Sequence, residues 1–303
     1  MAEGLREMVA PATRSRAARV AFPLLLLGNV ALAMGPFLVR HSGVGPVAAG
    51  FWRVTLAVPF LILLARLGRQ RIVPPTRKLT LTIAAGAFFF GTDVAAWNAG
   101  ILITKLGNAT LFGNIGSFLF AAWGLWLARQ RPSLFQALAL AGAATGCALL
   151  MWGSAELSLA HLHGDLLSAL AGLLYAGYLI AVDKARADVP PLGLLALSSV
   201  FAALTLLPIA LALGEPMIPA DWTGVFALAL VSQVVGQGLL VFAIGELSPL
   251  VVGLALLTQP ALSALLGWVY YGESMTGLDF LGAALIGAAL VLVRLRPPRA
   301  KPR

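Results

Sequence analysis

Long apolar stretches separated by short polar segments dominate this chain. A helix needs roughly 20 mostly apolar residues to cross the hydrocarbon core of a bilayer. Ten stretches meet this requirement, and they cover residues 20–39, 47–65, 79–101, 106–128, 134–152, 165–182, 191–213, 223–244, 249–271 and 277–293. The eighth and ninth are the hardest to separate, because the Gly245–Pro249 break also fits a kink in one long helix. The pattern predicts an all-α polytopic membrane protein with ten transmembrane helices.

Composition excludes an ordinary soluble protein. Of the 303 residues, 60% are hydrophobic and only 11% are charged, and the mean hydropathy is +0.92. A soluble domain carries about 25% charged residues. The arginines, the apolar run and the Ala31–Ala33 segment near the N-terminus also resemble a secretory signal. However, the run is too long for a signal and nine further spans follow, so we expect the first stretch to be retained.

The basic residues are sorted by side of the membrane. If the N-terminus is cytoplasmic, 18 of the 21 lysines and arginines fall on the cytoplasmic side, Arg40 and Lys105 fall on the other, and Arg53 lies within a span. This bias follows the positive-inside rule. It predicts that both termini of this multi-pass protein are cytoplasmic. The net charge of +9 therefore reflects topology, and no nucleic-acid partner is expected.

The two halves of the chain resemble each other at an offset of roughly 143 residues. Ile115–Gly146 aligns with Thr258–Ala289, and Phe22–Val39 aligns with Asp165–Val182. Because each half has an odd number of spans, similar halves must cross the membrane in opposite directions, as an inverted repeat. The predicted units are a first five-helix half, an outer linker and a second five-helix half. They cover residues 1–153 with a basic tail at 1–17, residues 154–164, and residues 165–303 with a basic tail at 294–303.

Three segments carry a resemblance to a known family. They are Phe51-Trp52-Arg53, Gly91–Trp97 with Ile103–Asn114, and Leu257-Thr258-Gln259-Pro260 followed by Glu273. With these segments the chain resembles, over residues 18–296, the ten-helix EamA-type branch of the drug/metabolite transporter superfamily. There are two departures. No proline lies near Asn114–Ser117, which predicts a straighter fourth helix, and Arg129 or Gln130 stands where the family often has glutamate.

The resemblance implies a secondary exporter of small amphiphilic metabolites that works by alternating access through a central cavity between the halves. Within that branch, the chain most resembles bacterial amino-acid exporters, including aromatic amino-acid exporters, which implies a place in the bacterial inner membrane. The assignment of the substrate rests on that resemblance alone. A multidrug or nucleotide-related exporter is the first alternative. A membrane-embedded enzyme acting on lipids would need clustered catalytic residues, which the sequence lacks, and a non-transporting receptor or scaffold would move no solute. We expect no enzyme activity, no cofactor and, without a Walker A pattern, no ATP-driven transport by this chain alone.

Two charged residues lie well within spans, where an ionised side chain costs about 2.5–3.5 kcal/mol on insertion scales. Arg53 and Asp93 are predicted to lie about 9 and about 10 Å below the same outer boundary, at 1.5 Å of rise per residue. The matching depths predict that they pair, directly or through water. The pair could fix helix packing, bind or gate the substrate, or couple transport to protons through Asp93.

Neutral polar and aromatic residues provide further candidates for substrate binding or gating. Amides and hydroxyls can hydrogen-bond both ends of a zwitterion, but they also commonly hold helices together. The candidates are Trp97, Asn98, Asn108, Thr110, Asn114, Tyr175, Tyr178, Gln233, Gln237, Thr258, Gln259 and Ser263, with Pro260 as a hinge. Gly142–Gly146 has the small-residue spacing of a helix contact or a dimer interface, so a monomer and a homodimer are both open. His161 and His163 near Glu156 and Asp165 are too weak a pattern to predict a metal site.

Overall fold

The computed structural model describes residues 2–72, 76–104, 106–129, 131–152, 159–272 and 275–295, which contain helices and no strand. The first half holds α1 (Ala2–Ala33), α2 (Gly35–Arg40), α3 (Pro46–Leu67), α4 (Arg77–Ile103), α5 (Leu106–Gly113), α6 (Ile115–Leu127) and α7 (Leu134–Trp152). The second half holds α8 (Leu162–Ala185), α9 (Pro191–Ala212), α10 (Thr223–Ala227), the π-helix η1 (Leu228–Gln237), α11 (Gly238–Glu246), α12 (Pro249–Leu256), α13 (Thr258–Tyr271) and α14 (Gly277–Leu295). The all-α class is confirmed.

Ten helical segments are long and apolar enough to cross a membrane, as the sequence predicts. Six spans are single helices, and the other four combine α1 with α2, α5 with α6, α10 with η1 and α11, and α12 with α13. The eighth and ninth spans are separate, because α11 ends at Glu246 and the Ser248 hydroxyl caps α12 by accepting from the Val251 N–H. Pro249 follows in the first turn of α12, where its missing N–H leaves no helical bond unmade.

The fourth span is interrupted at a single residue, Asn114, which keeps right-handed helical dihedral angles, and the straighter fourth helix stays a prediction. α5 ends at Gly113 and α6 begins at Ile115, although no proline lies nearby. The Asn114 side-chain amide donates to the Thr110 carbonyl over 2.9 Å. The Asn114 backbone N–H also donates to the Thr110 carbonyl, over 3.1 Å, so the amide adds a second bond to the helical one. The ninth span is interrupted at Leu257, the position that the predicted repeat aligns with Asn114.

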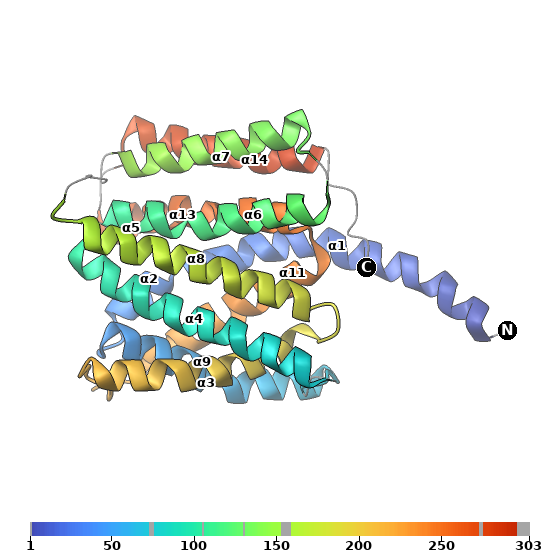
Figure 1. Ribbon diagram of the computed structural model, residues 1–303, viewed down its shortest axis with the longest axis horizontal. Coiled ribbons are helices and arrows are strands. Elements are labelled where there is room, and N and C mark those ends of the chain that lie inside the picture. The colour runs from blue at the N-terminus through green and yellow to red at the C-terminus, as the bar shows by residue number, and fades with distance from the viewer. Residues whose placement is uncertain are drawn as a thin grey trace.

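The spans lie side by side along the long axis of the molecule and stack in layers (Figure 1). α7 packs on α14 at one edge and α3 packs on α9 toward the opposite edge. Between these pairs, α4 packs on α8, and α1 packs on η1 and α11. In the predicted repeat, α7 is equivalent to α14 and α3 is equivalent to α9, so each of these pairs joins equivalent helices. The contact of α4 with α8 is equivalent to the contact of α11 with α1. The two halves are therefore interleaved.

Equivalent spans run antiparallel where they touch. Along α7 and α14, Gly142 lies against Ala289, and Gly146, about one turn later, lies against Gly282. The backbones approach so closely that a Cβ built on Gly282 would lie 2.6 Å from the Gly146 carbonyl oxygen. Contacts between α6 and α12 run in the same antiparallel sense. Opposite directions for equivalent spans are what an inverted repeat requires, so the packing supports that prediction.

The N-termini of α3 and α9 are capped reciprocally. Each helix has 22 residues and starts with a proline. The Glu215 carboxylate, in the loop after α9, accepts from the Ala48 N–H at the start of α3 over 2.8 Å. The Gln70 side-chain carbonyl, in the loop after α3, accepts from the Leu192 N–H at the start of α9 over 3.0 Å. These two polar caps satisfy helix-end donors at opposite ends of the bundle.

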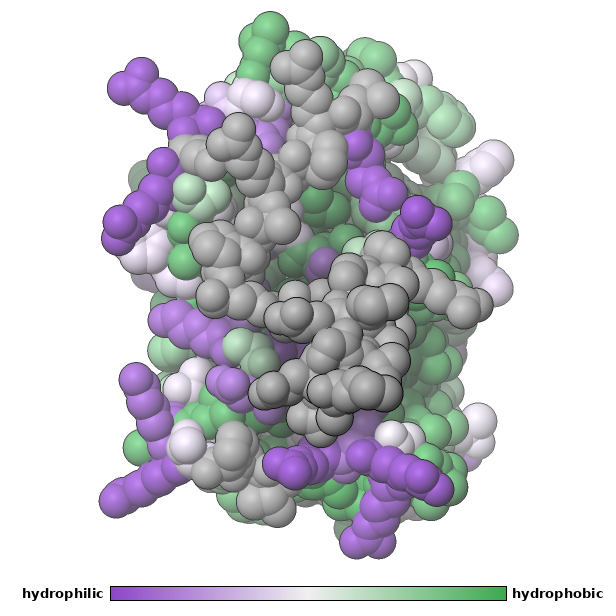
Figure 2. Space-filling view, turned by 90° about the vertical axis from the view of Figure 1, so that its right-hand side faces the viewer, coloured by the Kyte–Doolittle hydropathy of each residue, from purple (hydrophilic) through white to green (hydrophobic). Residues whose placement is uncertain are grey.

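One end of the bundle carries most of the described basic side chains. α1 projects beyond this end and α14 ends at it (Figure 1), and hydrophilic side chains project around its rim (Figure 2). Exposed basic residues of this end flank the starts and ends of the spans; they are Arg66, Arg69, Arg71, Arg77, Lys78, Arg129, Arg131, Lys184 and Arg294. Their distribution supports the predicted orientation, in which this end faces the cytoplasm.

The close contact of α7 with α14 yields a stability test. Replacing Gly282 with alanine places a methyl group against the Gly146 backbone, so the helices must separate; we expect a loss of about 1–3 kcal/mol in the free energy of unfolding. Gly287→Ala is the matched control, because nothing lies within 4 Å of a Cβ at that position on the same helix. Thermal unfolding in detergent measures both. Equal midpoints for the two variants would contradict the proposed close contact.

Candidate functional site

A hydrogen-bonded chain crosses the centre of the bundle and joins three helices. The Arg53 guanidinium, on α3, donates from Nε to the Gln233 side-chain oxygen, on η1, over 3.0 Å. Gln233 in turn donates from Nε2 to the Ser199 hydroxyl, on α9, over 3.1 Å. Gln233 and Ser199 are almost fully buried, at 2% and 1% exposure. Because α3 belongs to the first half and η1 and α9 to the second, the chain links the two halves.

Aromatic rings line the side of this chain that faces α4 and α8. The Arg53 guanidinium carbon lies 5.6 Å from the centre of the Phe90 ring, within range of a cation–π interaction. The Phe90 ring is 4.8 Å from that of Tyr178, and Tyr175 is 6.1 Å from Tyr178. We call Arg53, Phe90, Asp93, Tyr175, Tyr178, Ser199 and Gln233 the central cluster.

Asp93 lies in the central cluster without a direct partner. Within the described part of the chain, no ion pair or hydrogen bond reaches its carboxylate, although it is near enough to Arg53 for an electrostatic interaction. The predicted direct pairing is therefore not found, and the Nε of Arg53 bonds to Gln233 instead. Pairing through water stays a prediction. Both charged side chains keep some accessible surface although they lie deep in the bundle.

The π-helix η1 carries both glutamines of the eighth span. Gln233 belongs to the central cluster, and Gln237, at the end of η1, is 2% exposed. The side-chain oxygen of Gln237 is buried without a hydrogen-bond partner. Wide helical turns of this kind are rare and often occur at functional sites. This local geometry distinguishes the eighth span from the uninterrupted helix α3, which packs against η1.

A second polar group holds the interruption of the ninth span. The Asn29 amide, on α1, donates to the Ala255 carbonyl over 2.6 Å and to the Thr258 hydroxyl over 3.1 Å. Thr258 also donates to the Ala255 carbonyl. Pro260, in the first turn of α13, lies just after the break and stays a predicted hinge. Gln259 and Ser263 are partly exposed on the same helix.

The remaining candidates lie at the opposite end of α4 from its basic N-terminus. The Asn98 amide donates to the Pro46 carbonyl over 3.0 Å and so joins α4 to α3. The Trp97 ring packs on Gly113, which has no side chain to displace it. Asn114 bonds to the Thr110 carbonyl, while the Asn108 side chain lies outside the described residues. The contacts of Asn98 and Trp97 hold helices together. Of the predicted set, the central cluster contains Arg53, Asp93, Tyr175, Tyr178 and Gln233.

Two important residues were missed in the sequence. Phe90 is one of many phenylalanines in apolar spans, but its position three residues before Asp93 places both on the same face of α4. Asn29 is an amide in the middle of the first span, and polar residues at that depth commonly bond to neighbouring helices. No cluster of His, Cys, Asp and Glu in the described residues could hold a metal ion, and Glu156, part of the weak histidine pattern, lies outside them.

Comparisons with known proteins agree with this architecture. Residues 162–295 match the EamA-like transporter family. The threonine/homoserine exporter RhtA of Escherichia coli K12 is 28% identical over 275 residues, covering 88% of each chain. The same identity and coverage hold for RhtA of strain O157:H7. A crystal structure of a protein with 17% sequence identity superimposes with a TM-score of 0.77, covering 91% of this chain and 97% of the other, which supports the fold alone.

These relatives are transporters, which agrees with the expectation that the chain is not an enzyme. Ten apolar helices and a bacterial exporter as a full-length relative support a multi-pass membrane protein that moves a small molecule. The match also covers the second half, where the predicted Leu257–Pro260 segment lies. The resemblance to EamA-type exporters of the drug/metabolite transporter superfamily is therefore confirmed.

Proposed function

We propose that the chain exports amino acids across the bacterial inner membrane by alternating access, with the substrate held at the central cluster. One observation carries the proposal: both halves contribute to this cluster. Arg53 and Asp93 come from the first half, and Tyr178, Ser199 and Gln233 come from the second. A site between similar halves opens to one side and then to the other when their packing changes. The name of the relative, a threonine/homoserine exporter, supports the substrate class.

The predicted topology belongs to the same proposal. Both termini are cytoplasmic, and two five-helix halves, residues 1–153 and 165–303, are joined by an outer linker at 154–164. The protein works as a monomer or a homodimer without a cofactor. The basic rim in Figure 2 supports this orientation, and the antiparallel contact of α7 with α14 supports the inverted relation of the halves.

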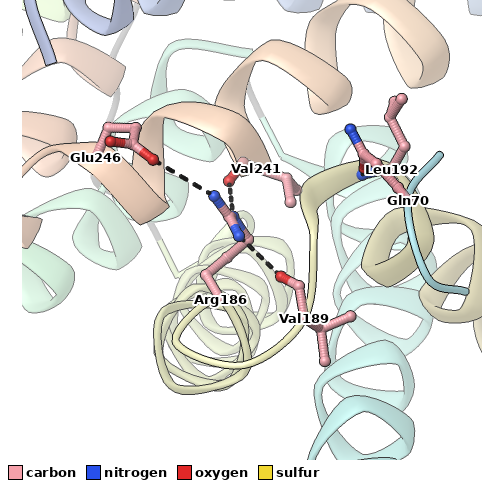
Figure 3. A network of polar contacts seen from close by, with 6 residues as sticks. All are labelled: Gln70, Arg186, Val189, Leu192, Val241 and Glu246. Atoms are coloured by element: carbon pink, nitrogen blue, oxygen red, sulfur yellow. Dashed lines mark hydrogen bonds and ion pairs between the residues drawn. The ribbon is translucent and has the colours of Figure 1, made fainter. Parts of the chain in front are cut away.

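The cytoplasmic end of the proposed pathway is closed by Arg186 (Figure 3). This side chain, just after α8, donates to the Val241 carbonyl of α11 over 3.0 Å and to the Val189 carbonyl over 2.8 Å. It also lies 3.9 Å from the Glu246 carboxylate at the end of α11. Since α8 packs on α4 and α11 packs on α1, Arg186 joins the two helix groups that alternating access separates. Opening toward the cytoplasm must therefore break its contacts with α11.

The Arg186 contacts can be tested by thiol labelling. In a Cys147→Ala background, the substitution Tyr175→Cys reports access to the central cluster from either side of oriented vesicles. Charge-assisted hydrogen bonds contribute about 1.5–3 kcal/mol, so Arg186→Met should speed labelling from the cytoplasmic side by about ten-fold. Lys184→Met is the matched control, because Lys184 lies over the Trp123 ring instead of reaching α11. Faster labelling from the outer side alone would contradict the proposed gate.

The transport activity itself is tested by counterflow in proteoliposomes. A mixed pool of labelled amino acids should exchange, with threonine and homoserine included, whereas cationic dyes and nucleotides should not. A folded Arg53→Gln variant should lose at least about ten-fold of the rate, because a charge-assisted contact to the substrate is removed. No exchange of any amino acid would overturn the proposed substrate class. Exchange of dyes or nucleotides alone would favour the multidrug or nucleotide-related alternative.

A further inference from the structure

We propose that Arg53 and Asp93 form a clamp for a zwitterion, in which Arg53 binds the carboxylate of the substrate and Asp93 binds its ammonium group. This inference rests on the proposed amino-acid transport and specifies how the substrate is recognised. The clamp requires both charges of the substrate, whereas amino-acid transport in general does not require this.

The first argument is that neither charge has a counter-ion in contact. Arg53 uses only its Nε, which donates to the neutral amide of Gln233. Its two terminal nitrogens donate to no described residue. The Asp93 carboxylate accepts no hydrogen bond within the described part of the chain either. Charges inside a membrane protein normally pair with one another or with backbone groups, so this arrangement leaves two opposite charges available to a ligand.

The second argument is their shared location. The Arg53 guanidinium carbon lies 5.6 Å from the ring of Phe90, which shares a face of α4 with Asp93 three residues later. The two charges are therefore near each other, and both retain accessible surface deep in the bundle. A ligand that reaches both must carry a negative and a positive group a few ångströms apart, as an α-amino acid does. An anion or an amine would neutralise one charge and leave the other exposed to a poorly solvating interior, which is costly.

The third argument is that the surrounding residues hold Arg53 ready for a carboxylate. The bond from Nε to Gln233, which is itself bonded to Ser199, fixes the guanidinium on one edge. The Phe90 ring covers its face at 5.6 Å. The remaining edge presents the parallel donors that bind a carboxylate in a bidentate manner. Tyr175, partly exposed and near both charges, gives the substrate side chain an aromatic surface.

The clamp predicts which analogues compete with the substrate. The probes are phenylalanine, phenyllactate, which lacks the ammonium group, and phenylalanine methyl ester, which lacks the carboxylate; threonine and its corresponding analogues form a second series. Sites built to bond a polar group reject analogues without it by up to about 10⁴-fold. In counterflow by the full-length protein, we expect each analogue to compete at least about 100-fold more weakly than its parent amino acid.

Two variants should each admit one analogue that the wild-type protein excludes. Asp93→Asn should let phenyllactate compete within about ten-fold of phenylalanine while the methyl ester stays excluded, because only the ammonium site has lost its charge. Arg53→Gln should do the reverse. Thr92→Val is the control next to Asp93, since Thr92 bonds only to the Phe88 carbonyl of its own helix, and it should keep the wild-type profile. A residue that merely held helices together would lower all rates without exchanging analogues.

Each other outcome overturns the clamp in a recognisable way. If the wild-type protein exchanges amino acids but accepts an analogue that lacks either charge equally well, the clamp fails and the proposed function stands. If Asp93→Asn keeps the analogue profile and loses only the response to a pH gradient, Asp93 carries protons instead. If the wild-type protein exchanges no amino acid, the proposed function fails and the clamp fails with it. Should a variant not fold, the wild-type analogue profile alone decides.

Discussion

A backbone group that loses its helical partner inside a bilayer has no water to replace it, and this constraint shapes the centre of the structure. At the interruption of the ninth span, the Ala255 carbonyl accepts from Asn29 and from Thr258. At the interruption of the fourth span, the Thr110 carbonyl keeps its helical bond from the Asn114 backbone N–H, and the Asn114 side-chain amide adds a second one. The break of the ninth span is thus satisfied by side chains, so irregular backbone can lie inside the bundle without leaving the Ala255 carbonyl unpaired.

Equivalent positions in the two halves meet this constraint with different chemistry. The repeat aligns Asn29 of α1 with Gly172 of α8. Asn29 donates a hydrogen bond at one break, whereas Gly172 lets the α8 backbone approach the Phe112 and Gly113 carbonyls at the other, where a Cβ would lie within 2.9 Å of both oxygens. The geometry of a break is therefore shared by the halves while the residues that secure it have diverged, which is why the repeat is faint in sequence.

The sequence predicts the spans well, because crossing a bilayer imposes a length and a hydropathy that any single segment must satisfy alone. It also predicts that Arg53 and Asp93 belong together, since buried charges are rare. It does not predict the partner of Arg53, because Gln233 lies 180 residues away and only the packing of η1 against α3 brings them together. The same holds for Phe90, whose role depends on the neighbouring guanidinium. The break at Asn114 has no proline that would signal it in the sequence.

The reciprocal caps of α3 and α9 give the two ends of the molecule different electrical character. Gln70 holds the start of α9 with a neutral amide, whereas Glu215 holds the start of α3 with a carboxylate. A negative charge at a helix N-terminus is favoured by the helix dipole, and the benefit falls as salt rises. Salt therefore weakens the cap at one end of the bundle and spares the cap at the other, so two geometrically matched ends respond unequally to ionic strength.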